Sequence, residues 1–167
     1  AMKDIAKLLQ TPSGRDLLQK VAYESRHDIT LSSLTPIEGQ DLAQVASNAV
    51  TEPRGGPAGA KFDPKVGTAS EVYYLPGQTA DDGKGHPWST SPSDAVLFHE
   101  LVHAYHMDRG TIPKAYVEDQ SGKLPESEYQ ATGLGTYRKD PGPNENDYRK
   151  ERREKLGEAL PDRETYR

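Results

Sequence analysis

The chain has 167 residues, no cysteine, and 21 Lys and Arg against 26 Asp and Glu, which gives a formal net charge of −5. Without thiols, disulfides and thiolate metal sites are excluded, and any strong metal ligands must be His, Asp or Glu. The negative charge, the lack of a basic patch interleaved with aromatic residues, and the lack of an apolar run of about 18 residues argue against nucleic-acid binding and membrane spanning.

The length predicts a single domain over residues 1–167 with a core of its own. Ala1, ahead of Met2, is expected to be a residue left from cloning. The amino-terminal segment lacks the apolar stretch of a Sec signal peptide.

The first predicted elements are two helices and a strand. Residues 3–10 carry apolar side chains at helical spacing, and Thr11 and Pro12 begin a second helix. Residues 27–32 alternate between polar and apolar, which predicts a half-buried strand with His27 at its edge in a structural or solvated role.

Loops separate the next predicted elements. Residues 51–70 are rich in Gly and Pro and are predicted to form a loop without a phosphate-binding pattern. Residues 71–75 predict a second strand. Residues 78–90 predict a long polar loop, in which His86 is expected to be a loop residue rather than a metal ligand.

A buried helix is predicted at about residues 92–109. Ser91 is expected to be its N-cap, Pro92 its first residue and Asp94 the reciprocal acid of a capping box, while Gly110 ends it. Its apolar side chains predict that the helix is buried, as expected for a helix that carries a metal site. They are Val96, Leu97, Leu101, Val102, Ala104 and Tyr105.

This helix contains a His-Glu-x-x-His motif. His99 and His103 lie four residues apart on one helical face and can both bind one Zn²⁺. Glu100 is the expected general base for water that the metal activates. The alternative is a chance occurrence, with both histidines on an ordinary helix surface. Zinc is favoured because buried, unpaired imidazole and carboxylate groups would each cost several kcal/mol.

The third ligand must come from another element. His106 is excluded because about 10 Å of helix separates it from His99, and it is expected to lie beside the site or at the edge of the core. A short helix over residues 126–133 follows an irregular stretch and supplies Glu128. Glu128 is preferred to Glu126, for which a first-turn role at the helix end is expected. Glu118 and Asp119 remain alternatives.

The last predicted element is a helix over residues 144–156. Asn144 is its cap, and a Glu151–Lys155 pair is expected to support it. The mixed charges of residues 149–155 predict a solvated face.

With these residues in place, the chain resembles the NleD-like zinc metallopeptidase family of bacterial effectors and toxin modules. The likeness spans most of the chain. It rests on residues 98–106, Glu128, residues 133–135, Tyr137, Glu145, Asn146, Arg149 and residues 160–166, and more weakly on residues 11–18.

The resemblance implies an α+β fold: a small zincin-like metallopeptidase domain with a buried active-site helix, a small sheet and long loops. It implies Zn²⁺ on His99, His103 and Glu128, with Glu100 catalytic. We expect a phenol near the site, Tyr137, to stabilise the oxyanion.

The resemblance also implies a protein substrate. Known members cleave host mitogen-activated protein kinases in the activation loop. We expect a monomer that the bacterium secretes without a Sec signal in this chain and that acts in the target-cell cytoplasm.

Two alternatives differ in biology or chemistry. The chain could be an interbacterial toxin domain with a cognate immunity protein. It could also be a non-catalytic, zinc-containing module that binds a partner, with His86 or Asp119 closing the site as a fourth ligand.

Overall fold

The computed structural model describes residues 1–54, 66–81, 83, 85–119 and 122–165. The helices are α1 (Met2–Leu8), α2 (Pro12–Tyr23), α3 (Leu42–Ala46), α4 (Ser93–Arg109), α5 (Glu126–Thr132), the 3₁₀ helix η1 (Gly135–Lys139) and α6 (Glu145–Leu156). The strands are β1 (Ile29–Ser33), β2 (Val50–Arg54), β3 (Ala69–Tyr74), β4 (Ala80–Asp81), β5 (Thr90–Ser91), β6 (Tyr116–Asp119) and β7 (Gly122–Pro125). The predicted α+β class is confirmed.

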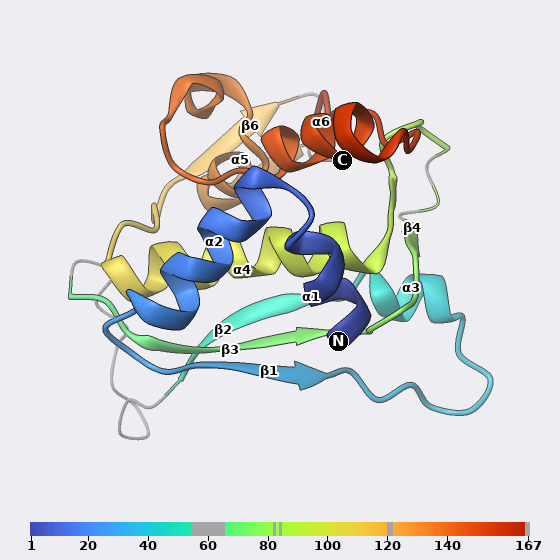
Figure 1. Ribbon diagram of the computed structural model, residues 1–167, viewed down its shortest axis with the longest axis horizontal. Helices are drawn as coiled ribbons and strands as arrows, with labels where there is room; N and C mark the ends of the chain where they lie inside the picture. The colour runs from blue at the N-terminus through green and yellow to red at the C-terminus, as the bar shows by residue number, and fades with distance from the viewer. Residues whose placement is uncertain (55–65, 82, 84, 120–121, 166–167) are drawn as a thin grey trace.

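The largest sheet is small and mixed. It has three strands in the order β1-β3-β2, with β1 parallel and β2 antiparallel to β3. The pairs β4–β5 and β6–β7 form separate antiparallel ribbons. The long helices lie on one side of the three-stranded sheet, with α4 directly over it (Figure 1).

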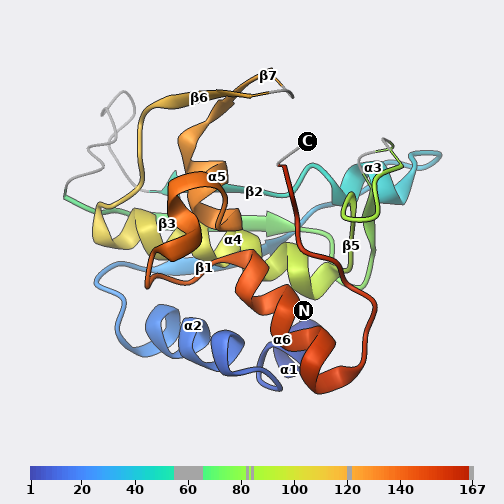
Figure 2. The same ribbon diagram turned by 90° about the horizontal axis from the view of Figure 1, so that it is seen from above.

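Helix α4 is the centre of the core. It contacts β2 and β3 on one side and α1, α2, α5 and α6 on its other sides, as the view from above also shows (Figure 2). Phe98 of α4 stacks on Tyr148 of α6 with ring centroids 4.5 Å apart. The predicted burial of this helix is therefore correct, and every neighbouring element is positioned relative to it.

Three predicted loops contain strands. β2 lies in the segment predicted as loop 51–70, whose residues 55–65 are outside the described part of the chain. β4 and β5 lie within or next to predicted loop 78–90, and the β6–β7 hairpin lies in the stretch predicted to be irregular. Strand pairing overrides the local turn signals in all three, although the β6–β7 pair is a hairpin of adjacent segments. β2 tolerates Pro53 because it is an edge strand.

The predicted start of α4 is wrong. The N-cap is Pro92, without a side-chain cap hydrogen bond, and Ser91 belongs to β5. The Asp94 carboxylate accepts hydrogen bonds from Tyr148 Oη at 2.6 Å, Lys7 Nζ at 3.3 Å and the Arg152 guanidinium. Asp94 is fully buried, so these tertiary partners outcompete a local capping box. The predicted end is correct, because Gly110 is left-handed with φ 66°.

The predicted solvated face of α6 is only partly correct. Asn144 caps the helix as predicted, and its side chain accepts from the Asp147 N–H. Arg149 and Arg152, however, are fully buried, and Glu151 accepts two hydrogen bonds from Ser13. The helix therefore turns two arginines of its charged run towards the core, where carboxylates pair with them.

The turn between α5 and α6 is tightly packed at Gly133. This residue ends α5 with φ 78°, as predicted, and a Cβ built on it would lie 2.5 Å from Asn144 Oδ1. Gly157 also ends a helix in the left-handed region, with φ 66°, but a Cβ there would meet nothing within 4 Å.

We predict that Gly133→Ala destabilises the protein more than Gly157→Ala. Both variants force alanine into the left-handed region at roughly 1–2 kcal/mol, but only the first also collides with the α6 cap. Urea unfolding of the two variants and the wild type measures the difference in free energy of unfolding. Equal losses would show that the Gly133–Asn144 approach contributes nothing to stability.

Candidate functional site

Three side chains from α4 and α5 converge on one point. His99 Nε2 lies 3.1 Å from His103 Nε2 and 3.1 Å from Glu128 Oε2, and His103 Nε2 lies 3.3 Å from the same oxygen. Both histidines are buried, and the Glu128 side chain is 20% exposed. The structure thus brings together the three residues predicted as metal ligands.

The spacing of these atoms fits a tetrahedral metal site. Ligand atoms about 2.0 to 2.1 Å from a tetrahedral zinc ion lie about 3.3 to 3.4 Å from one another. The three separations, 3.1 to 3.3 Å, are close to that value. Within the described residues, His99, His103 and Glu128 are the group of His, Asp and Glu side chains that could hold a metal ion.

Glu145 fixes the orientation of His99. Its Oε2 lies 2.9 Å from His99 Nδ1, so a neutral imidazole donates its Nδ1–H to Glu145. The lone pair on His99 Nε2 then faces the Glu128 carboxylate, which is also an acceptor. A proton or a metal ion between them is required, because two acceptors at this distance repel each other.

The charges around the site favour a cation. Burial lowers the pKa of His99, but the carboxylates of Glu128 and Glu145 outweigh it and raise the pKa to about 10. Burial raises the pKa of Glu128, but hydrogen bonds and charge from His103 and His99 hold it well below its usual range. A bound divalent ion would supply the positive charge that these carboxylates favour.

Glu100 lies beside this cluster in a different environment. It is buried, and its Oε2 is 2.8 Å from Thr51 Oγ1 of strand β2. Burial raises the pKa of Glu100, while the nearby imidazoles of His103 and His99 oppose that shift. A carboxylate whose proton affinity is raised in this way is suited to accept and release a proton.

Sequence reasoning missed Glu145 and Thr51. Glu145 was named only among the residues that carry the resemblance, without a role, and Thr51 was placed in a loop. Their relation to α4 depends on contacts 46 and 49 residues away in the sequence. For Glu145 the resemblance was the available signal, because the sequence does not show that this first-turn residue of α6 is buried.

Other candidate residues lie outside the three-residue group. His106 is buried with Nδ1 2.8 Å from Thr111 Oγ1, and His86 stacks on Trp88. Glu118 is on β6, and the side chain of Asp119 is outside the described part of the chain. His27 lies just before β1 and is paired with Asp108 at 3.1 Å, which is the structural one of the two predicted roles, structural or solvated.

Tyr137 lies on η1 with its hydroxyl engaged. It donates to Glu126 Oε1 at 2.9 Å, and burial together with this carboxylate raises its pKa to about 12. Glu126 therefore lies in the first turn of α5 and also accepts the hydrogen bond of the Tyr137 phenol. The oxyanion role of Tyr137 stays a prediction.

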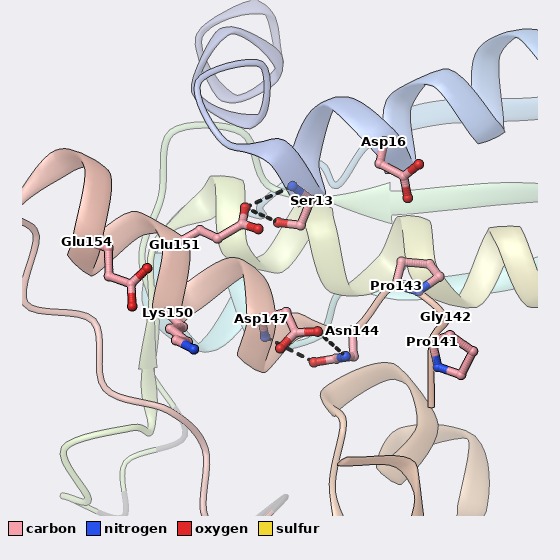
Figure 3. A pocket seen from close by; sticks show the side chains of 10 residues that line it. All are labelled: Ser13, Asp16, Pro141, Gly142, Pro143, Asn144, Asp147, Lys150, Glu151 and Glu154. Atoms are coloured by element: carbon pink, nitrogen blue, oxygen red, sulfur yellow. Dashed lines mark hydrogen bonds between the residues drawn. The ribbon is translucent and has the colours of Figure 1, made fainter. Parts of the chain in front are cut away.

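A hollow of about 300 Å³ between α2 and α6 is separate from these residues (Figure 3). Its lining includes Asp16, Asp147, Glu151 and Glu154, and Glu151 is held by Ser13. None of the three converging residues or Glu100 lines it.

Of the comparisons with known proteins, one identifies the family of the chain. A search of curated proteins gave no match. None of the described helices is long and apolar enough to cross a membrane. The model of one family, Peptidase_M91, described as an effector protein, matches residues 1–166. The chain therefore belongs to this NleD-like peptidase family, whose members are protease-type bacterial effectors.

Proposed function

We propose that this protein is a zinc-dependent endopeptidase. His99, His103 and Glu128 hold a catalytic Zn²⁺, and Glu100 is the general base. The observation that carries the proposal is the convergence of three donor atoms, 3.1 to 3.3 Å apart, on the helix face next to a buried carboxylate. Two histidines and one carboxylate are a ligand set of catalytic zinc sites, which keep a position for water.

A metal ion held by His99, His103 and Glu128 would act as a Lewis acid towards the scissile carbonyl and would lower the pKa of the attacking water. Glu100 accepts the proton from this water and delivers it to the leaving amine. Thr51 donates a hydrogen bond to one carboxylate oxygen of Glu100, which orients the other for proton transfer. His103 and His99 face the same carboxylate and moderate the effect of burial on its proton affinity.

The number of protein ligands supports a catalytic rather than a structural metal site. A structural zinc ion is closed by four protein ligands. The group found among the described residues has three members, and His86, one suggested fourth ligand, is exposed and stacked on Trp88 instead. This arrangement favours the endopeptidase over the non-catalytic binding module.

The substrate that we propose, by the resemblance, is a host protein kinase cut in the target-cell cytoplasm. Membership of an effector family supports secretion and action in another cell. A kinase panel and, separately, a bacterial cytoplasmic extract are incubated with the zinc-loaded protein, and mass spectrometry of the fragments tests the substrate. Cleavage only of bacterial proteins would favour the interbacterial toxin instead.

We predict that Glu100→Gln keeps zinc but loses turnover by roughly 10²–10⁴-fold. Glutamine retains the shape of the side chain and an acceptor for Thr51 but cannot take a proton at physiological pH. Metal content by mass spectrometry and cleavage rate are measured on the same sample. Full activity in a correctly folded variant would rule out Glu100 as the base.

We predict that Glu128→Ala weakens zinc binding by at least roughly 100-fold and abolishes cleavage, because a ligand contributes more than an outer partner of a ligand. Glu126→Ala is the matched control from the same helical turn: it loses the hydrogen bond with Tyr137 and keeps zinc. Zinc affinity is measured by competition with a chelator. Wild-type affinity in Glu128→Ala would move the third ligand to another residue.

Tyr137→Phe tests the proposed oxyanion role. If the phenol stabilises the oxyanion, kcat falls by roughly 10²–10³-fold while zinc affinity is unchanged. Glu126→Ala, which frees the hydroxyl, keeps activity in that case. An unchanged kcat in Tyr137→Phe would restrict this hydroxyl to its structural contact with Glu126.

A further inference from the structure

The segment after α6 folds back onto the helix. Residues 157–165, here called the C-terminal arm, run from the far end of α6 back past the start of α4 (Figure 2). Leu160 is buried in the main core, and the Asn146 side chain exchanges two hydrogen bonds, 2.8 and 3.0 Å long, with the backbone of Arg163. Arg153 donates to Leu160 O and pairs with Asp162.

The Arg163 side chain reaches the residue that orients His99. Its Nε lies 3.1 Å from Glu145 Oε1, and its Nη2 lies 2.9 Å from Ser91 Oγ. Arg149 contacts the same two groups, with Nε 2.6 Å from Glu145 Oε1 and Nη2 on Ser91 Oγ. Two guanidinium groups therefore share the same two acceptors, one carboxylate oxygen of Glu145 and the Ser91 hydroxyl.

The two oxygens of Glu145 have separate partners. Oε1 faces Arg149 and Arg163, while Oε2 lies 2.9 Å from His99 Nδ1. The side chain is 1% exposed, so water cannot replace either set of partners. With Oε1 held by charge-assisted hydrogen bonds, the plane of the carboxylate and the direction of Oε2 are fixed. This direction in turn sets the imidazole whose Nε2 faces the metal position.

We propose that Arg163 is a positioning residue for the metal site, acting from the C-terminal arm through Glu145 on His99. The inference rests on the proposed function in that His99 is a zinc ligand. Because coupling between two equilibria is reciprocal, zinc bound at His99 also stabilises docking of the arm. The arm thereby becomes part of the metal site although it supplies no ligand.

Arg163 is a better probe of this contact than Arg149. The Arg149 side chain is 0% exposed and also donates to Pro161 O, so its removal leaves a buried gap and an unpaired carbonyl in addition to the lost contact with Glu145. The Arg163 side chain is 18% exposed, and Arg149 still pairs with Glu145 when it is removed. Arg153 is the matched control, since it also fastens the arm but contacts Leu160 and Asp162 rather than Glu145.

The test compares Arg163→Ala, Arg163→Lys and Arg153→Ala in the full chain. Zinc dissociation constants are measured by chelator competition, and thermal unfolding of the metal-free proteins reports folding. Loss of an outer partner of a zinc ligand weakens binding by roughly 10–100-fold, and we expect the lower end for Arg163→Ala because Arg149 remains. Lysine at this position restores part of the affinity, and Arg153→Ala changes affinity by less than about twofold, since exposed ion pairs contribute little.

A second measurement uses cobalt in place of zinc. The visible absorption of Co²⁺ reports ligand geometry, so Arg163→Ala should shift the spectrum while Arg153→Ala leaves it as in the wild type. An unchanged zinc affinity in folded Arg163→Ala, or equal losses in both alanine variants, would overturn the proposal. If Arg163→Ala does not fold without metal, Arg163→Gln takes its place. Glutamine keeps an N–H donor without the charge, and an unchanged zinc affinity in this variant would likewise overturn the proposal.

These readouts separate the two proposals. If the protein binds zinc and Arg163→Ala weakens that binding as expected, but no protein is cleaved, the proposed peptidase function is wrong while the positioning role stands. If the protein cleaves its substrate but its zinc affinity does not change in Arg163→Ala, the proposed peptidase function stands and the positioning role is overturned.

Discussion

Helix α4 carries ionisable side chains at buried positions, and none of them is tolerable in a protein interior without a partner. They are Asp94, His99, Glu100, His103, His106 and Asp108, each no more than 7% exposed. Each of them has a partner from outside the helix. Tyr148 and Arg152 of α6 contact Asp94, and Thr51 of β2 contacts Glu100. The fold can thus be described as the set of elements that satisfies this one helix.

The same constraint gives three carboxylates near the two histidines three different environments. Glu128 faces the Nε2 atoms of both histidines, where positive charge holds its pKa far below its usual range. Burial would raise the pKa of Glu145, but Arg149 and Arg163 keep it ionised as the acceptor for His99. Among the described residues, Glu100 has Thr51 and the two histidines rather than an arginine beside it, and burial raises its pKa. These environments suit the three chemically identical side chains to the roles that we propose for them: metal ligand for Glu128, orienting group for Glu145 and proton carrier for Glu100.

Local signals explain what could be predicted from the sequence. The position and end of α4 follow from its apolar pattern and from Gly110, and α5 was found through Gly133. Glu128 was chosen by residue type and by its place on that second helix, and the structure brings it to His99 and His103. These inferences needed only residues within a few turns of one another.

The rest depends on contacts between distant segments. Periodicity did not reveal that Arg149 and Arg152 are the inward residues of a charged helix, because charge spacing does not identify the buried face. Ser91 looked like an N-cap but accepts hydrogen bonds from two arginines, one of them 72 residues away. β2 and the β6–β7 hairpin follow from strand pairing that local Gly and Pro signals conceal.

We propose that one zinc ion lies among His99, His103 and Glu128 with a position left for water. Diffraction from crystals of the zinc-loaded protein, with data collected at the zinc absorption edge, tests it most directly. We predict one anomalous peak about 2.0 to 2.2 Å from His99 Nε2, His103 Nε2 and a Glu128 carboxylate oxygen, without a fourth protein ligand. A peak elsewhere in the molecule, or a site closed by four protein side chains, would contradict this account.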